Sequence, residues 1–129
     1  MYEFNLTLNL PFEQAVEKVR ETLMGEQLGV VSEIDVQAIF KAKMDKDIAP
    51  YRIMGACNPK LAERVLEAEP NAGTLLPCNF VMRAEGDATV VSFMDPASVL
   101  ALSENETVRE IGSEARVKLQ RVADTLAGV

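Results

Sequence analysis

The sequence predicts an α+β protein in which helices pack on one face of a mainly antiparallel sheet. Residues 2–10 alternate between apolar and polar side chains, which is typical of a strand with one face in water. Segments 78–84 and 88–94 have the pattern of two strands joined by a short turn, as in an antiparallel hairpin. Segment 106–126 carries apolar residues at helical spacing. The expected order of elements is β-α-β-α-β-α-β-β-α.

The length and the charge limit the classes of protein and partner. The 129 residues are the size of one domain, so we expect a single domain over residues 1–129. The net charge of −7 opposes binding to nucleic acid or to an anionic membrane, because both need clustered lysines and arginines. The chain has no histidine, which excludes a Ser-His-Asp triad. We therefore expect neither nucleic acid nor a membrane as a partner.

The start of the chain bears on its location. It has no basic segment followed by an apolar run, so no secretory signal is expected. A cytoplasmic location follows, and in the cytoplasm the two cysteines are normally reduced.

The first strand is followed by a helix. Its apolar face carries Tyr2, Phe4, Leu6, Leu8 and Leu10, and its polar face carries Glu3, Asn5, Thr7 and Asn9. Pro11 suits the first turn of a helix and Gly25 suits a helix end, so a helix is expected over residues 12–24.

A second strand and helix are expected between residues 28 and 50. Residues 28–34 have a strand pattern, and Asp35 can cap a helix that ends before Pro50. We expect the apolar residues of this helix to face the core; they are Val36, Ile39, Phe40 and Met44.

A third strand and helix contain the first cysteine. Residues 51–57 have a strand pattern, and Asn58 followed by Pro59 is a helix start in which Asn is the cap and Pro is the first helical residue. The inner stripe of this helix is expected to be Ala62, Val65 and Leu66. Pro70 ends the helix and begins a turn.

The last third of the chain holds the hairpin and the long helix. The hairpin turns at Glu85-Gly86-Asp87, and Asp95-Pro96 ends its second strand, a role that fits Asp95 better than that of a catalytic acid. Segment 99–102 fits either a short strand or a helical turn. The final helix should bury Val108, Ile111, Ala115, Leu119, Val122 and Leu126.

Two cysteines, each followed by asparagine, are the most specific feature of the chain. Cys57 ends a strand just before a helix cap, where the partial positive charge of a helix N-terminus can lower the pKa of a thiol. Cys78 follows Leu76-Pro77, and the residue before a proline is held extended, which fixes the direction of the chain. Either cysteine could instead be a small buried residue that serves packing alone.

These motifs predict a ligand site at Cys57, Asn58, Cys78 and Asn79. Asn58 has a sufficient alternative role as a helix cap. Arg52 and Arg83 are out of phase with the cysteines of their own strands, so we expect them on the opposite face, in water or bound to an anion.

The sequence assigns no metal, no cofactor and no catalytic residue. Two cysteines without histidine cannot complete a four-ligand zinc site within one chain. A dimer could supply four thiolates, and a copper(I) site could recruit the sulfur of Met54, Met82 or Met94.

The two motifs together resemble a known family. "GACNP" before a helix, then "GTLLPCNFVM", a hairpin and "DP" are similar to the family catalogued as domain of unknown function 302. The resemblance implies a fold like that of the TATA-binding protein, which is a curved antiparallel sheet with helices on one side. It also implies a homodimer. The family has no settled activity.

The leading interpretation is therefore a small homodimeric binding module with a small-ligand site beside Cys57 and Cys78. One alternative is an enzyme that cycles the two thiols through a disulfide or a persulfide. Another is a structural protein whose polar sheet face, with Glu3, Asn5, Thr7 and Asn9, forms the dimer. The first two interpretations require that both sulfur atoms reach one pocket.

Overall fold

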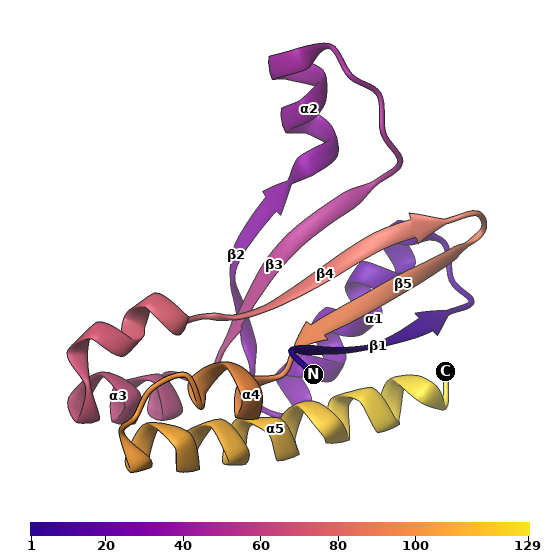
Figure 1. The fold of residues 1–129 in the computed structure, drawn as a ribbon. Coiled ribbons are helices and arrows are strands. Elements are labelled where there is room, and N and C mark those ends of the chain that lie inside the picture. Colours follow the sequence, from indigo (N-terminus) through magenta and orange to yellow (C-terminus); the bar gives the residue numbers. More distant parts are fainter.

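A computed structural model describes all residues, 1–129. The strands are β1 (Glu3–Leu8), β2 (Gly29–Asp35), β3 (Tyr51–Cys57), β4 (Cys78–Glu85) and β5 (Ala88–Met94). The helices are α1 (Phe12–Gly25), α2 (Val36–Met44), α3 (Pro59–Ala68), α4 (Pro96–Leu100) and α5 (Glu106–Ala127), with a 3-10 helix, η1, at Pro70–Leu75 (Figure 1). The predicted order is confirmed, with η1 and α4 in addition.

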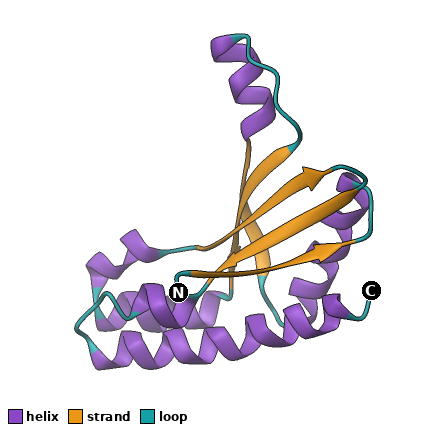
Figure 2. Ribbon diagram, turned by 45° about the vertical axis from the view of Figure 1, so that its right-hand side comes forward, coloured by secondary structure: helices purple, strands orange, loops and turns teal.

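The five strands form one sheet in the order β1-β5-β4-β3-β2, and every neighbouring pair is antiparallel. Helices α1 and α5 cover one face of this sheet, and the other face is open (Figure 2). The α+β class with helices on one side is therefore confirmed. The β4-β5 hairpin turns at Gly86, whose φ of 60° favours glycine.

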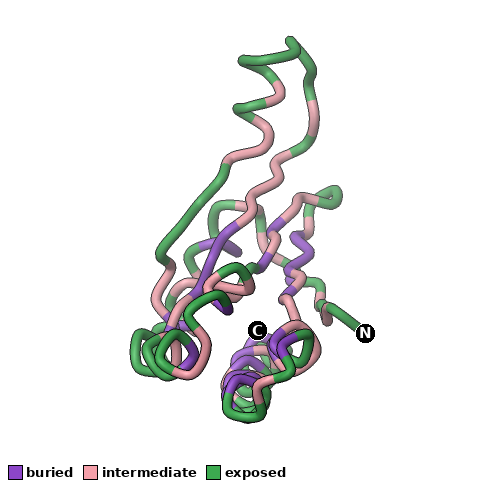
Figure 3. The backbone as a smooth tube through the Cα atoms, turned by 60° about the vertical axis from the view of Figure 1, so that its left-hand side comes forward, coloured by how far each residue is buried: buried purple, intermediate pink, exposed green.

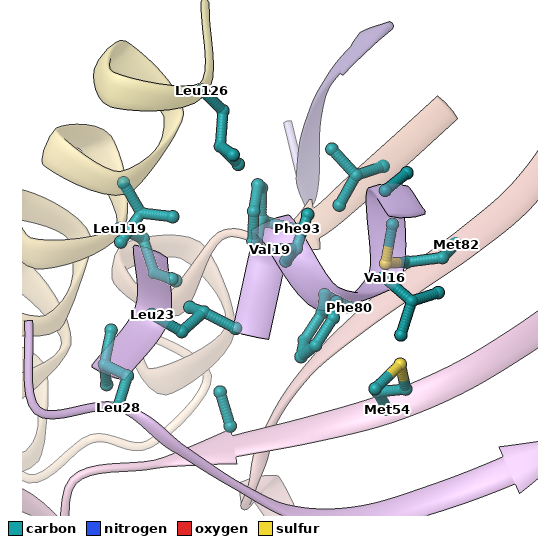
Figure 4. Close-up of a cluster of buried hydrophobic side chains, with 14 of the residues drawn as sticks. Val16, Val19, Leu23, Leu28, Met54, Phe80, Met82, Phe93, Leu119 and Leu126 are labelled. Carbon is teal, nitrogen blue, oxygen red and sulfur yellow. The ribbon is translucent and has the colours of Figure 1, made fainter. Parts of the chain in front are cut away.

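The main hydrophobic core lies between the sheet and the two long helices (Figure 4). Its largest fully buried side chains include Phe80 and Phe93 from the sheet, Leu23 from α1 and Leu119 from α5. These residues lie on one face of their strands or helices, so the periods of two and 3.6 in the sequence locate this core correctly.

A second, smaller core lies at the end of the sheet, where α3, η1 and α4 meet α5. It consists of Val65, Ala72, Leu100, Val108 and Ile111. Helix α5 contributes to both cores, since its first turns pack in the small one and Leu119, Val122 and Leu126 pack in the main one.

The predictions of which residues α2 and α3 bury are wrong in two places. Helix α2 contributes no buried residue, so its apolar side chains do not face the core. Leu66 of α3 is also largely exposed, and Val65 is the residue that this helix buries. Helical spacing identifies an apolar face, but it does not determine what covers that face.

The approach of β3 to its neighbours requires glycine at position 55. A Cβ atom built on Gly55 would lie 2.4 Å from Oγ of Ser32 and 2.5 Å from Cγ of Pro77. Ser32 belongs to β2 and Pro77 directly precedes β4, so the glycine lets both neighbours pack against β3. The same contact positions the Leu76-Cys78 segment beside the start of α3.

We predict that Gly55→Ala lowers the free energy of unfolding by about 1–3 kcal/mol, because the added methyl group overlaps Ser32 and Pro77. Gly25→Ala is the control, since nothing lies within 4 Å of its Cβ position, and it should raise stability by about 0.4–1 kcal/mol. Urea denaturation measures both. If the two variants were equally stable, the close approach of Ser32 and Pro77 to Gly55 would be contradicted.

Candidate functional site

An apolar pocket lies where the end of β3, the start of α3 and the Leu76-Cys78 segment meet α5. Its empty volume is ≈ 360 Å³, which includes the mouth open to solvent. The enclosed part is narrow and has room only for a group of a few atoms. Thirteen residues line it, of which 11 are hydrophobic, and they include Cys57, Asn58 and Cys78.

The pocket exists because small side chains line the junction between the two cores. Leu28 and Ala56 belong to the main core, whereas Val65, Leu100 and Ile111 belong to the small one, and all five line the pocket. Beside them the wall includes the small side chains of Ala62 and Ala115 together with Leu61, Leu76 and Pro77. An alanine at these positions leaves space that a leucine would fill, so the two cores do not close on each other.

Both cysteines line this one pocket, as the ligand interpretation requires. Ala56 pairs with Cys78 across β3 and β4, so Cys57 lies one residue beyond that pair. The sulfurs are close enough for charge on Cys57 to raise the pKa of Cys78. Both thiols are free and each residue is partly exposed.

The position before α3 does not give either cysteine a low pKa. Burial raises the pKa of the Cys57 thiol above its ordinary value. Burial, with a smaller contribution from Cys57, raises the pKa of Cys78 to about 11. Both thiols are therefore protonated at neutral pH, contrary to the thiolate that the sequence suggested.

Asn58 is the N-cap of α3, as predicted. Its Oδ1 accepts hydrogen bonds from the backbone N–H groups of Lys60, at 3.0 Å, and Leu61, at 3.1 Å. The residue is only 9% exposed, and the structure gives its Nδ2 amide no hydrogen-bond partner. The side chain therefore caps the helix through its oxygen, and because no fully buried side-chain polar atom lacks a partner, its Nδ2 amide keeps some access to solvent.

Asn79 does not belong with the other three predicted residues. It is exposed and lies in a shallow groove on the open face of the sheet, with Asn5 and Tyr51. Successive residues of a strand point to opposite faces, so Asn79 is turned away from the side to which Cys78 points.

The two arginines point to opposite faces of the sheet. Arg52 lies on the helix side, over the ring of Phe12 at 5.1 Å and in an ion pair with Glu33 at 3.3 Å. Arg83 is on the open side and pairs with Glu85 at 2.6 Å. Each arginine has a carboxylate partner, so together they do not form the anion site that the sequence allowed.

Asp95 has a structural role. Its Oδ1 accepts the N–H of Ala97 at 2.9 Å and caps α4, and its other oxygen pairs with Arg116 of α5 at 2.9 Å. The candidate methionine ligands do not line the pocket with the cysteines. Met54 and Met82 are buried in the main core, and no group of three or more Cys, Asp or Glu side chains has the spacing of a metal site.

Sequence reasoning missed the walls of the pocket. Leu28 lies in the loop before β2, Ala62 in α3 and Ala115 in α5. These segments are far apart in the chain, and only tertiary packing brings them together. The sequence contained one signal of the pocket. An alanine lies on the inner stripe of α3 and of α5, and a side chain that small leaves space in the packing.

The comparisons with known proteins agree with this single-sheet α+β fold. The profile of the family described as "Domain of unknown function DUF302" matches residues 4–126, so the chain belongs to that family. A solved crystal structure of an uncharacterized conserved DUF302 protein from Bacillus stearothermophilus has the same fold, with a TM-score of 0.85 at 24% identity. The match covers 98% of this chain and 97% of that one.

None of the curated proteins matches the chain. The comparisons therefore identify the family and the fold without assigning an activity. Among the helices, none combines the length and the apolar character needed to cross a bilayer.

We predict that Asn58→Ala lowers the free energy of unfolding by about 1 kcal/mol, because two N–H groups at the start of α3 lose their acceptor. Asn79→Ala should change it by less than about 0.5 kcal/mol, since that side chain is exposed. Thermal denaturation of both variants makes the comparison. If Asn79→Ala lost more stability than Asn58→Ala, the assignment of Asn58 as the cap of α3 would be contradicted.

A second prediction concerns alkaline pH. The pKa of Cys78 is higher in the folded chain, at about 11, than its ordinary value of 9.0, so the folded state holds the proton more tightly. This contribution to stability is complete below pH 9.0 and is lost as pH rises through 11, by roughly 2–3 kcal/mol. Cys78→Ala should lose less stability than the parent over that range. If the parent and Cys78→Ala gave parallel curves of unfolding free energy against pH, burial of the Cys78 thiol in the folded state would be refuted.

Proposed function

We propose that the protein is a homodimeric binding module that takes a small, neutral, mainly apolar ligand in the pocket between α3 and α5. The observation that carries the proposal is the composition of the pocket, in which 11 of 13 lining residues are hydrophobic, the two cysteines included, and Asn58 supplies the one amide. Apolar pockets with a few polar groups are the usual form of small-ligand sites.

The charge state of the pocket supports a neutral ligand. Both thiols are protonated at neutral pH, since the ordinary thiol pKa of 9.0 already favours the neutral form and burial raises it further. No charged side chain lines the pocket, so an ionic ligand would lose its hydration without a counter-charge.

In this proposal one hydrogen bond, from the side chain of Asn58, orients the ligand. The cap of α3 uses Oδ1 of Asn58, so the Nδ2 amide is free to donate to a ligand in place of solvent. A ligand with one acceptor, such as a carbonyl or ether oxygen, would satisfy that donor while its apolar part lies among the alanines.

The thiol-enzyme interpretation is the second candidate. The shared pocket favours it, because a disulfide or persulfide needs neighbouring sulfurs. The raised pKa values oppose it, since the thiolate is the nucleophile and little thiolate is present at neutral pH. We therefore rank binding above thiol chemistry.

The proposed setting is the cytoplasm, where free thiols such as Cys57 and Cys78 stay reduced. The proposed partner is a second copy of the chain. Nucleic acid is not a proposed partner, because the net charge is −7.

The test uses 2-butanone, a four-carbon probe with one acceptor oxygen, and NMR chemical shifts of backbone amides. We expect saturable shifts confined to residues around Asn58, Ala62 and Cys78. Ala62→Leu, which fills the pocket, should abolish them, while Ala127→Leu, an exposed change at the end of α5, should not.

A matched variant isolates the amide donor. Asn58→Asp keeps a good N-cap but removes the Nδ2 donor, so we expect the probe to bind several-fold more weakly with the helix intact. If the parent shows no saturable shifts and Ala62→Leu is simply more stable, the pocket is a packing gap and the proposal fails.

A further inference from the structure

Helix α2 extends away from the rest of the molecule. Figure 1 shows it beyond the end of β2 and the start of β3. Figure 3 shows that this part of the backbone is exposed or half-buried throughout. We call residues 35–50 the arm; they comprise α2 and the segment that returns to β3. Within the chain, α2 packs mainly against β3 and buries no residue.

The arm has well-formed ends. Oδ1 of Asp35 accepts the N–H of Ala38 at 2.9 Å, and Asp45 ends the helix in the left-handed conformation, with φ of 50°. Nε2 of Gln37 donates to the backbone oxygen of Ile48 at 3.0 Å and connects the helix to the returning segment. These bonds define the shape of the arm but bury little apolar surface.

Apolar side chains of the arm and of adjoining β2 are uncovered. Ile39 is 42% exposed and Met44 is 57% exposed, and on β2 Ile34 is 46% exposed. Val31, at the irregularity in β2, is also exposed. An isolated helix of nine residues is marginal in water, and within one copy α2 has little packing beyond its contacts with β3.

The uncovered surface continues onto the open face of the sheet. Ile34 pairs with Ile53 across β2 and β3, and Ile53 pairs with Val81 across β3 and β4. Ile53 and Val81 are half-buried. An apolar band therefore runs from the arm across three strands.

The total surface is larger than that of a compact monomer. A protein of 14.1 kDa is expected to expose about 6,700 Å². This chain exposes 7307 Å², an excess of about 600 Å². The projecting arm thus leaves more surface available than a compact fold would, and a standard interface buries roughly 800 Å² on each partner.

The charge distribution favours a second copy as the partner. The arm carries three lysines, Lys41, Lys43 and Lys46, and three aspartates, Asp35, Asp45 and Asp47, so it is neutral. The whole net charge of −7 therefore lies on the rest of the chain. Two copies repel each other through their bodies and can approach most closely at their neutral arms.

We propose that two copies of this chain associate through an isologous interface made by the arm and the apolar band, which buries Ile34, Ile39 and Met44 of both copies. This inference rests on the homodimer in the proposed function and names the surface that forms it. A two-fold axis places the same patch on both sides, so one uncovered patch per chain is sufficient. The polar face of β1, with Asn5 and Thr7, is then not the dimer surface.

The experiment measures the mass of the full chain by sedimentation equilibrium. We expect twice the chain mass for the parent. The double variant Ile39→Glu/Met44→Glu should raise the dissociation constant of the dimer about a hundredfold or more, because it places charges in the centre of the interface. The control is Val117→Glu, a similar change at a 53% exposed position of α5, which should leave the dimer intact.

Each outcome decides the proposal. A monomeric parent overturns both the arm interface and the homodimer. A dimer that persists unchanged in the arm variant overturns the arm interface alone, as does loss of the dimer in Val117→Glu. Circular dichroism checks that each variant is folded. Binding of 2-butanone is measured in the same samples, so failure of the pocket is seen separately from failure of the interface.

Discussion

The structure depends on the packing of α5 against two separate cores. Its C-terminal turns bury Leu119, Val122 and Leu126 under the sheet, and its N-terminal turns bury Val108 and Ile111 against α3 and α4. One rigid helix thus fixes the distance between the cores. Because small residues occupy the junction, the distance leaves a gap instead of a continuous core.

The gap gives the cysteine motifs their setting. Gly55 allows Pro77 to pack against β3, and this contact brings Cys78 beside the end of that strand. Asn58 starts α3 at the same point, so the helix and both thiols border one space. Burial keeps the thiols neutral, which makes the site suited to apolar recognition and poorly suited to nucleophilic chemistry.

Local signals in the sequence predicted local structure well. Asn58-Pro59 starts a helix because the cap and the proline act within one turn, and the hairpin at Gly86 depends on one backbone conformation. The separation of Asn79 from Cys78 was also predictable, since neighbours in a strand face opposite sides. The pocket walls and the projection of α2 could not be predicted, because they depend on which distant elements pack together. Helical spacing at Ile39 and Met44 showed an apolar face without showing that this chain leaves it uncovered.

The most direct test of the central claim is a crystal structure of the protein under xenon pressure, because xenon enters apolar cavities without needing polar contacts. We expect one xenon atom between α3 and α5, in contact with Ala62 and Ala115 and beside both cysteine side chains. An absence of xenon there, with Cys57 and Cys78 each enclosed by separate hydrocarbon packing, would contradict the shared pocket on which the proposed function depends.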